Sequence, residues 1–249
     1  MGARASGMAY ASSCLSDEWS IFNNIAGLAS VQTPTASFSC DVQPGFMPFN
    51  KSAAVIATPI KPGVAGVGFY RFGDDLYNEQ IITGGYSNQF GLAALGVKVN
   101  YIQYNATGYG RKGVFTVSFG GIAELTPHLF IGAHIVNINQ PKLSPDYDET
   151  TPTILIAGIL IKPSDNTLIT TELEKDLEYK PTWKTGIEHS VYKKFVFRTG
   201  FSVYPSSGFL GMGFKLKKFL IDYTFQYRPE LGARHQSSVT YRFHNLEKK

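Results

Sequence analysis

Acidic side chains recur at every second position of one predicted strand, residues 167–179. They share one face because successive side chains of a strand point to opposite faces. The row consists of Glu172, Glu174, Asp176 and Glu178. On the lipid side of a membrane each carboxylate would cost a few kcal/mol, so this face should point into the lumen of a barrel.

Basic side chains that could neutralise this row occur on the polar faces of other predicted strands and near the N-terminus. The candidates are Arg4, Lys98, Lys184, Arg198, Arg228 and Arg242. One interpretation is an ion-lined pore, and the other is a salt-bridged lumen that holds an internal segment. The presence of both signs of charge favours the second, because an unpaired charge inside a protein is strongly destabilising.

Enzymatic chemistry finds little support. Ser206 and Ser207 lie in a turn, and the chain has no G-x-S-x-G nucleophile elbow. His128 beside a turn and His235 in the predicted loop Pro229–Gln236 are more typical of solvated surface than of catalysis. The five histidines are dispersed and there is no Cys-x-x-Cys, so we expect no catalytic site, no metal and no cofactor.

Period-two alternation is the main structural signal. From Phe219 to Tyr227 every odd position is apolar, whereas Asp222, Thr224 and Gln226 lie between them. Comparable alternation from Val31 onward predicts about 14 strands. Charged residues make up 17% and aromatic residues 14% of the 249 residues, a balance typical of transmembrane strands with aromatic girdles. We therefore predict an all-β fold: a single antiparallel transmembrane β-barrel.

The connections between predicted strands alternate between tight and long. Turns such as Lys61-Pro62-Gly63 alternate with longer segments such as Asn105–Lys112 and Gln140–Pro152. Short periplasmic turns and longer external loops are typical of outer-membrane barrels, which predicts a bacterial outer-membrane location with both termini periplasmic.

A soluble β-sandwich is the competing fold. The longest apolar run, residues 154–161, is too short for a transmembrane helix.

Residues 1–30 lack strand periodicity, so we divide the chain into an N-terminal luminal plug (1–30) and a transmembrane barrel (31–249). The plug residues expected to contact the lumen are Arg4, Asp17, Glu18, Trp19, Phe22, Asn23 and Asn24. The glycine pairs Gly84-Gly85 and Gly120-Gly121 fit bends or a close approach of this plug. Cys14 and Cys40 form either a plug-to-wall disulfide or two separate buried thiols.

The N-terminal segment resembles the hatch of the FadL-like outer-membrane barrels, above all the PorV-type branch associated with protein secretion in Bacteroidetes. The resemblance rests on a G-A-R-x-x-G-M-x-x-A stretch, which starts at Gly2, and on a D-x-W stretch, which leads into N-P-A-G-L-A. Here Asp17 and Trp19 match, and Asn24 precedes Ala26 to Ala29, but Ile25 replaces the proline.

The resemblance implies a non-enzymatic accessory subunit that binds a larger outer-membrane export or assembly complex, besides outer-membrane lipid. A FadL-type channel for small hydrophobic molecules is the alternative, and an outer-membrane enzyme is a second alternative. Predicted external loops of about 4–13 residues leave little material for a ligand funnel, which favours the accessory role. The formal net charge of +4 without long basic blocks argues against a nucleic-acid partner.

Overall fold

The computed structural model describes residues 1–108, 110–142, 150–192 and 194–243. Three short helices, α1 (Ala3–Gly7), η1 (Glu18–Ile21) and η2 (Ile25–Ser30), precede the strands, and η3 (Met47–Phe49) follows the first of them. The strands are β1 (Thr35–Val42), β2 (Lys51–Ile60), β3 (Gly63–Gly73), β4 (Tyr77–Phe90), β5 (Ala93–Ala106), β6 (Gly110–Thr126), β7 (Leu129–Val136), β8 (Ile154–Ser164), β9 (Thr167–Asp176), β10 (Thr182–Val191), β11 (Phe195–Val203), β12 (Ser207–Lys215), β13 (Phe219–Arg228) and β14 (Gly232–Arg242).

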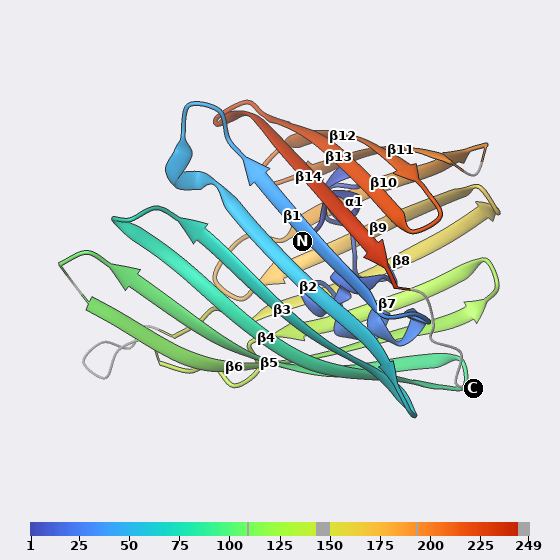
Figure 1. Ribbon diagram of the computed structural model, residues 1–249, viewed down its shortest axis with the longest axis horizontal. Helices are drawn as coiled ribbons and strands as arrows, with labels where there is room; N and C mark the ends of the chain where they lie inside the picture. Colours follow the sequence, from blue (N-terminus) through green and yellow to red (C-terminus); the bar gives the residue numbers. More distant parts are fainter. Residues whose placement is uncertain (109, 143–149, 193, 244–249) are drawn as a thin grey trace.

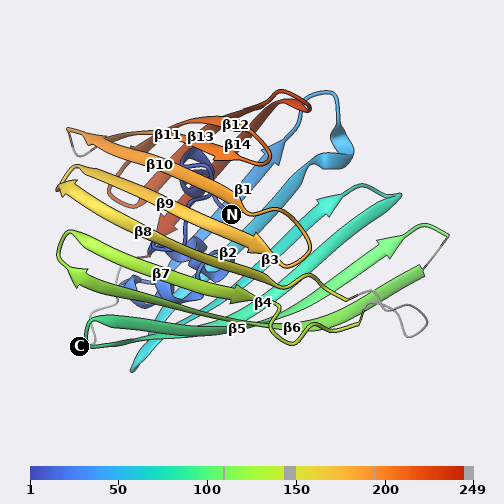
Figure 2. The same cartoon turned by 180° about the vertical axis from the view of Figure 1, so that it is seen from behind.

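The described strands form one closed antiparallel barrel in chain order (Figure 1), which confirms the predicted fold class. The barrel closes where β1 pairs with β14, in a register that runs from Thr35 opposite Arg242 to Val42 opposite His235. Figure 2 shows the opposite wall, where β7 to β10 run side by side. Among the described residues, no helix is long and apolar enough to cross a membrane.

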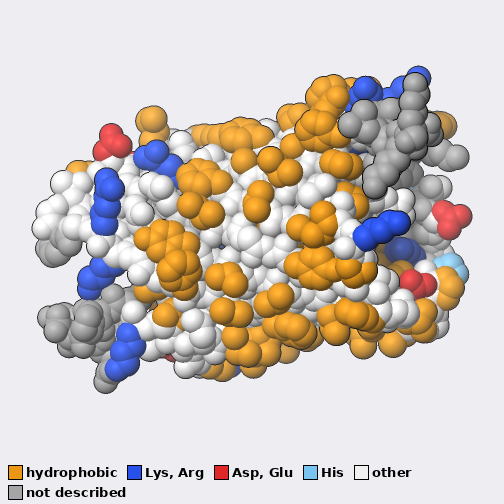
Figure 3. Space-filling view, turned by 60° about the horizontal axis from the view of Figure 1, so that its bottom comes forward, with side chains coloured by type: hydrophobic (Ala, Val, Ile, Leu, Met, Phe, Trp, Pro, Cys, Tyr) orange, Lys and Arg blue, Asp and Glu red, His pale blue; other side chains and the backbone are white. Residues whose placement is uncertain are grey.

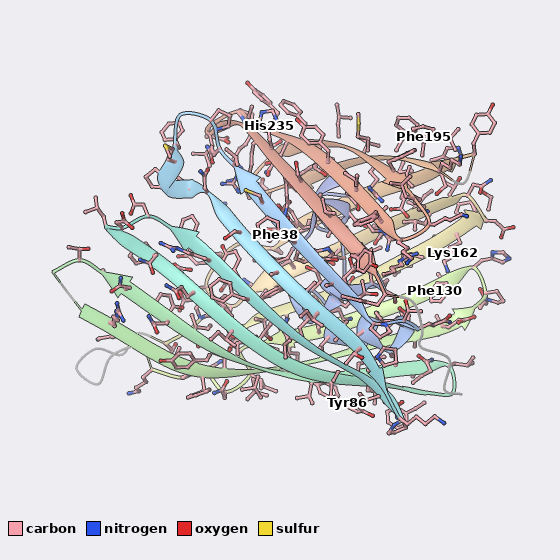
Figure 4. The ribbon with its side chains drawn as sticks, in the orientation of Figure 1. Phe38, Tyr86, Phe130, Lys162, Phe195 and His235 are labelled. Atoms are coloured by element: carbon pink, nitrogen blue, oxygen red, sulfur yellow. The ribbon has the colours of Figure 1, made fainter. Side chains whose placement is uncertain are left out.

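The predicted alternation decides which side chains of each strand point outward and which point into the lumen. On β13, Phe219, Ile221 and Tyr223 are exposed, whereas Asp222 and Thr224 are buried in the interior. Apolar side chains cover much of the outer surface in Figure 3, and the charged side chains lie toward its two ends. Outward aromatic residues on well-separated strands, Phe38 and Phe195 among them, are labelled in Figure 4.

The two ends of the barrel differ in their connections. At the short-turn end, β2–β3, β4–β5, β6–β7, β8–β9, β10–β11 and β12–β13 are joined by tight turns. At the long-loop end, residues 43–50 and 137–153 form the longest connections, and part of the predicted loop Gln140–Pro152 lies outside the described residues. Two predicted loops are shorter than expected because the strands continue: Asn105–Lys112 reduces to residues 107–109, and Pro229–Gln236 to residues 229–231.

The N-terminal segment, residues 1–30, lies inside the barrel (Figure 1). It is built from short helices with side-chain caps, which explains its lack of strand periodicity. The Asp17 carboxylate accepts a hydrogen bond from the Trp19 amide at the start of η1, and Asn24 accepts one from the Ala26 amide at the start of η2. Such caps satisfy amide groups that a short helix leaves without internal partners.

Glycines on the inner face of the wall allow the N-terminal segment to approach the strand backbone. A Cβ atom on Gly132 would overlap the Ser13 carbonyl oxygen, and one on Gly186 would overlap Met8. Gly85 and Gly120, one from each predicted pair, contact the N-terminal segment in the same way, through Ile25 and Asn24. The expected close approach is therefore present at these two positions.

We expect Gly132→Ala to displace the N-terminal segment, because the added methyl group meets a backbone oxygen that cannot rotate away. Overpacking of this kind costs about 1–3 kcal/mol. Thermal unfolding of the detergent-solubilised barrel should show a lower midpoint. Gly84→Ala is the matched control, since a Cβ there meets no described atom within 4 Å. Equal midpoints for the two variants would contradict this account.

Candidate functional site

A buried cluster of charges joins the N-terminal segment to three strands of the wall. The Arg4 guanidinium donates to both Glu188 carboxylate oxygens at 2.9 Å each, and to Asp17 at 3.1 Å. Glu188 also accepts a 2.6 Å hydrogen bond from Arg198, which in turn donates to Asp222 at 2.6 Å. Bidentate guanidinium–carboxylate pairs of this kind are strong and directional, so the cluster fixes both position and orientation.

Burial and neighbouring charges act in opposite directions on Arg4. Burial by itself lowers the pKa of the guanidinium, but Glu188 and Asp17 raise it above its ordinary value. Arg4 therefore stays charged at any physiological pH. Removing one partner from a buried ion pair typically costs about 3–5 kcal/mol because the other charge is left uncompensated. This cluster anchors the first turn of the N-terminal segment.

The acidic row of β9 forms a second anchor. Glu172 is buried, and one carboxylate oxygen accepts hydrogen bonds from the Ser12 and Ser13 amides at 2.8 and 2.7 Å. Lys184 of β10 contacts Glu172 at 3.4 Å and pairs with Glu174. Glu172 and Glu174 lie on the inner face of β9, and of the row it is Glu172 that holds the segment, whereas Glu178 lies beyond the end of β9 and is exposed.

Lys98 of β5 forms a third anchor without a carboxylate. Its ammonium group is buried and donates to the carbonyl oxygens of Ile21, Phe22 and Asn23 at 2.9, 2.8 and 3.3 Å. These carbonyls close the C-terminal end of η1, where helix carbonyls lack internal partners. A cation at a helix C-terminus is also favoured by the local dipole.

Glu18 connects the segment to the closing seam of the barrel. Its Oε1 accepts hydrogen bonds from Ser37 of β1 at 2.6 Å and from Thr240 of β14 at 2.7 Å. Burial is the main reason that the pKa of Glu18 is raised, and the nearby Asp17 adds to it. One side chain of the N-terminal segment thus bonds both strands that complete the barrel.

The remaining predicted residues of the segment have mixed roles. Asn24 is fully buried, and its amide donates to Ser13, to Gly121 of β6 and to Ala133 of β7. Trp19 packs in an apolar cluster within the lumen, and Phe22 lies against Gly68. The side-chain amide of Asn23 donates to the Met1 carbonyl, and Asn23 meets the wall through its backbone carbonyl, which accepts from Lys98.

The alternative of a Cys14–Cys40 disulfide is wrong. Both thiols are free, because Cys14 lies inside the barrel and Cys40 faces outward between Ser39 and Asp41, which face inward. The Cys14 thiol donates to the Gly158 carbonyl at 3.3 Å. Burial raises its pKa to about 12, which keeps the thiol protonated.

Three predicted lumen charges do not join the clusters. Asp176 accepts a hydrogen bond from the Glu178 amide, and Arg228 donates to Ser207 at 3.3 Å near the long-loop end. Arg242 lines the lumen at the short-turn end, the opposite end from Arg228. Among the described residues none of these three forms an ion pair.

Sequence reasoning missed Glu188 and Asp222, which hold the first cluster together. Glu188 shares the inward parity of Lys184 on β10, and Asp222 is one of the polar positions noted on β13. The alternation therefore indicated that both face inward. It gave no register, and only the register brings Glu188 opposite Arg198.

The histidines considered for catalysis lie apart from these clusters. His235 belongs to β14, not to a loop, and its ring meets the Tyr223 hydroxyl at 2.6 Å on the outer face. His128 lies in a turn near the Lys162 carbonyl, and Lys162 itself covers the Phe130 ring at 4.3 Å (Figure 4). Among the described residues, no group of three or more His, Cys, Asp or Glu side chains is placed to hold a metal ion.

Two cavities lie in the lumen, and the N-terminal segment lines both of them. The long-loop cavity has a volume of about 580 Å³ and is bounded by Tyr10, Ser12 and Phe22 of the segment. The short-turn cavity has a volume of about 690 Å³ and is bounded by Arg4, Glu18 and other residues of the segment. The segment therefore separates the two ends of the lumen.

The two cavities differ in character. The short-turn cavity is lined mainly by charged and polar side chains, with Lys215, Lys217, Lys218 and Arg242 at its rim. The long-loop cavity has an apolar wall beside its polar one. The apolar wall consists of Val136 on β7 and of Ile154 and Ile156 on β8, whereas Phe22, Ala53 and Tyr70 pack together as a separate apolar patch beside β2 and β3. The rest of the lining is mostly polar or charged, and includes Asp41, Lys51, Glu172, Glu174 and Lys184.

These features define an outer-membrane-type β-barrel with an internal N-terminal segment. No family model matches the chain, and no curated protein matches it. Among solved structures it is similar to the CymD monoaromatic hydrocarbon channel, with a TM-score of 0.78 and 12% identity over 98% of each chain. It is also similar to the toluene transporter TodX of Pseudomonas putida, with a TM-score of 0.74 and 11% identity over 97% of each chain.

A porin, KdgM, matches more loosely, with a TM-score of 0.50 and 11% identity over 84% of this chain and 99% of the porin. Because the sequence identities are this low, these matches establish a shared fold and do not by themselves establish a shared function. The strong matches are to hydrocarbon channels and not to subunits of an export complex, so the predicted accessory role in protein export is wrong. Nothing in these matches supports the PorV-type branch.

We expect Lys98→Met to loosen the end of η1. The change leaves three carbonyls without their donor, and an unsatisfied buried polar group costs about 1–3 kcal/mol. Hydrogen exchange of the amides in residues 18–23 should accelerate. Lys112→Met, at an exposed position of β6, is the control and should leave exchange in this range unchanged. Unchanged exchange in Lys98→Met would contradict the anchoring role.

Proposed function

We propose that this chain is an outer-membrane channel for small hydrophobic molecules and that residues 1–30 act as its plug. The observation that carries the proposal is the long-loop cavity, whose apolar wall of Val136, Ile154 and Ile156 ends at the plug. A volume of about 580 Å³ lies within the range of small-molecule pockets. The fold likeness to channels named for monoaromatic hydrocarbons and toluene supports the same class of cargo.

The arrangement of the chain supports a direction for the channel. Short turns are periplasmic in outer-membrane barrels, so the short-turn end, where β14 ends at Arg242, faces the periplasm in this proposal. The predicted periplasmic position does not hold for Met1, which lies inside the lumen and lines the long-loop cavity. The long-loop cavity then opens toward the outside and receives the molecule first. The three anchors at Arg4, Glu172 and Lys98 keep the plug seated between the cavities.

The proposal is tested by the initial uptake of labelled toluene into Gram-negative cells that lack a hydrocarbon channel of their own. Cells that produce the chain should take up toluene faster than cells that do not. Ile156→Trp should return uptake close to the rate without the protein, because the indole fills the cavity. Ile161→Trp is the matched control, since Ile161 lies on the same strand and faces outward. Uptake that is insensitive to Ile156→Trp would refute the proposal.

Planar-bilayer conductance separates a plugged hydrophobe channel from an open porin. We expect the intact chain to carry almost no ion current, because the plug residues fill the lumen between the two cavities. A chain that lacks residues 1–30 should conduct, provided that a semi-native gel shows a folded barrel. A steady porin-like current through the intact chain would refute the plug and favour an open channel.

A further inference from the structure

One buried histidine in the long-loop cavity has a ring nitrogen without a hydrogen-bond partner among the described residues. His134 of β7 lines this cavity and is only 8% exposed. Its Nδ1 atom is buried and has no partner among the described residues, so a ligand reaches this atom once the side chain turns toward the cavity. Buried polar side-chain atoms in native proteins nearly always have at least one partner. A neutral imidazole offers one donor and one acceptor, so the ring is equipped to bind a hydroxyl group.

The neighbours of His134 on the inner wall cannot satisfy it. In the register of the sheet it stands opposite Gly120 of β6 and Ile156 of β8, which bring no polar side-chain atom. Val136 and Ile154 stand opposite each other one step further toward the long-loop end. His134 is therefore the polar end of an apolar strip formed by Val136, Ile154 and Ile156.

The other polar groups on this side of the cavity are already engaged. Glu172 accepts from the Ser12 and Ser13 amides, and Lys184 pairs with Glu172 and Glu174. Glu174 stands opposite Ile156, so a carboxylate lying on the strip would be repelled by it. The strip consequently suits an uncharged molecule with a single polar group.

We infer that the long-loop cavity selects uncharged hydrophobes that carry one hydroxyl group, such as simple phenols, over bare hydrocarbons. The apolar body lies against Val136, Ile154 and Ile156, and the hydroxyl hydrogen-bonds the His134 ring. A hydroxyl can serve either ring nitrogen because it both donates and accepts. This inference rests on the proposed channel function and specifies its cargo.

The test compares binding of p-cresol and toluene, which differ by one hydroxyl, to the detergent-solubilised full chain by isothermal titration calorimetry. After correction for partition into empty micelles, the wild-type chain should prefer p-cresol. His134→Leu should weaken p-cresol binding roughly three- to tenfold, the worth of one net hydrogen bond, and leave toluene binding unchanged. His134→Gln should retain most of the preference, since an amide also donates and accepts.

The outcomes separate this inference from the function on which it rests. If both compounds bind equally to the wild-type chain, or if His134→Leu weakens them equally, the selectivity assigned to His134 is wrong and the channel proposal stands. If neither compound binds and toluene uptake is also absent, the channel proposal itself fails. The wild-type comparison decides the matter even if a His134 variant does not fold.

Discussion

The pairing of β1 with β14 is the contact on which the rest of the structure depends. In lipid no water can satisfy the backbone groups of an open sheet edge, so a transmembrane sheet must close on itself. Closure encloses a lumen, and the alternation of the strands then sends every second side chain into it. The polar positions of the wall thus become interior positions that require partners. Glu18 bonds the two closing strands from inside, which links the closure to the filling of the lumen.

The N-terminal segment supplies many of those partners. Arg4 joins Glu188, whereas backbone amides of Ser12 and Ser13 satisfy Glu172, and backbone carbonyls of η1 satisfy Lys98. Each anchor pairs a side chain with a group that would otherwise be buried alone. Glycines such as Gly132 leave room for this close approach. The segment and the wall are therefore complementary in charge and in shape.

Where the segment ends, the lumen is left partly open as two unlike cavities. The short-turn cavity is strongly charged, whereas the long-loop cavity combines an apolar strip with polar and charged groups. Apolar side chains inside the barrel supply no hydrogen-bond partner to the polar side chains of the wall. They offer a favourable environment for a hydrophobic molecule. In the proposal, the long-loop cavity is the entrance of the channel, and His134 gives it a preference for molecules that carry a hydroxyl group.

The sequence by itself determined the facing of the strands, because facing follows from local period-two alternation. The barrel was predicted from the number of strands, the alternation of tight and long connections and the resemblance of the N-terminal segment, since alternation alone fits a β-sandwich equally well. The sequence also indicated the inward orientation of Glu172 and the close approach at Gly85 and Gly120. The loops around His235 were misplaced, since turn residues also occur within strands. Only the tertiary structure decided which charges pair, that Cys14 lies inside the barrel while Cys40 faces outward, and that Nδ1 of His134 has no partner among the described residues. These facts depend on the register between strands and on the path of residues 1–30, and local pattern encodes neither of them.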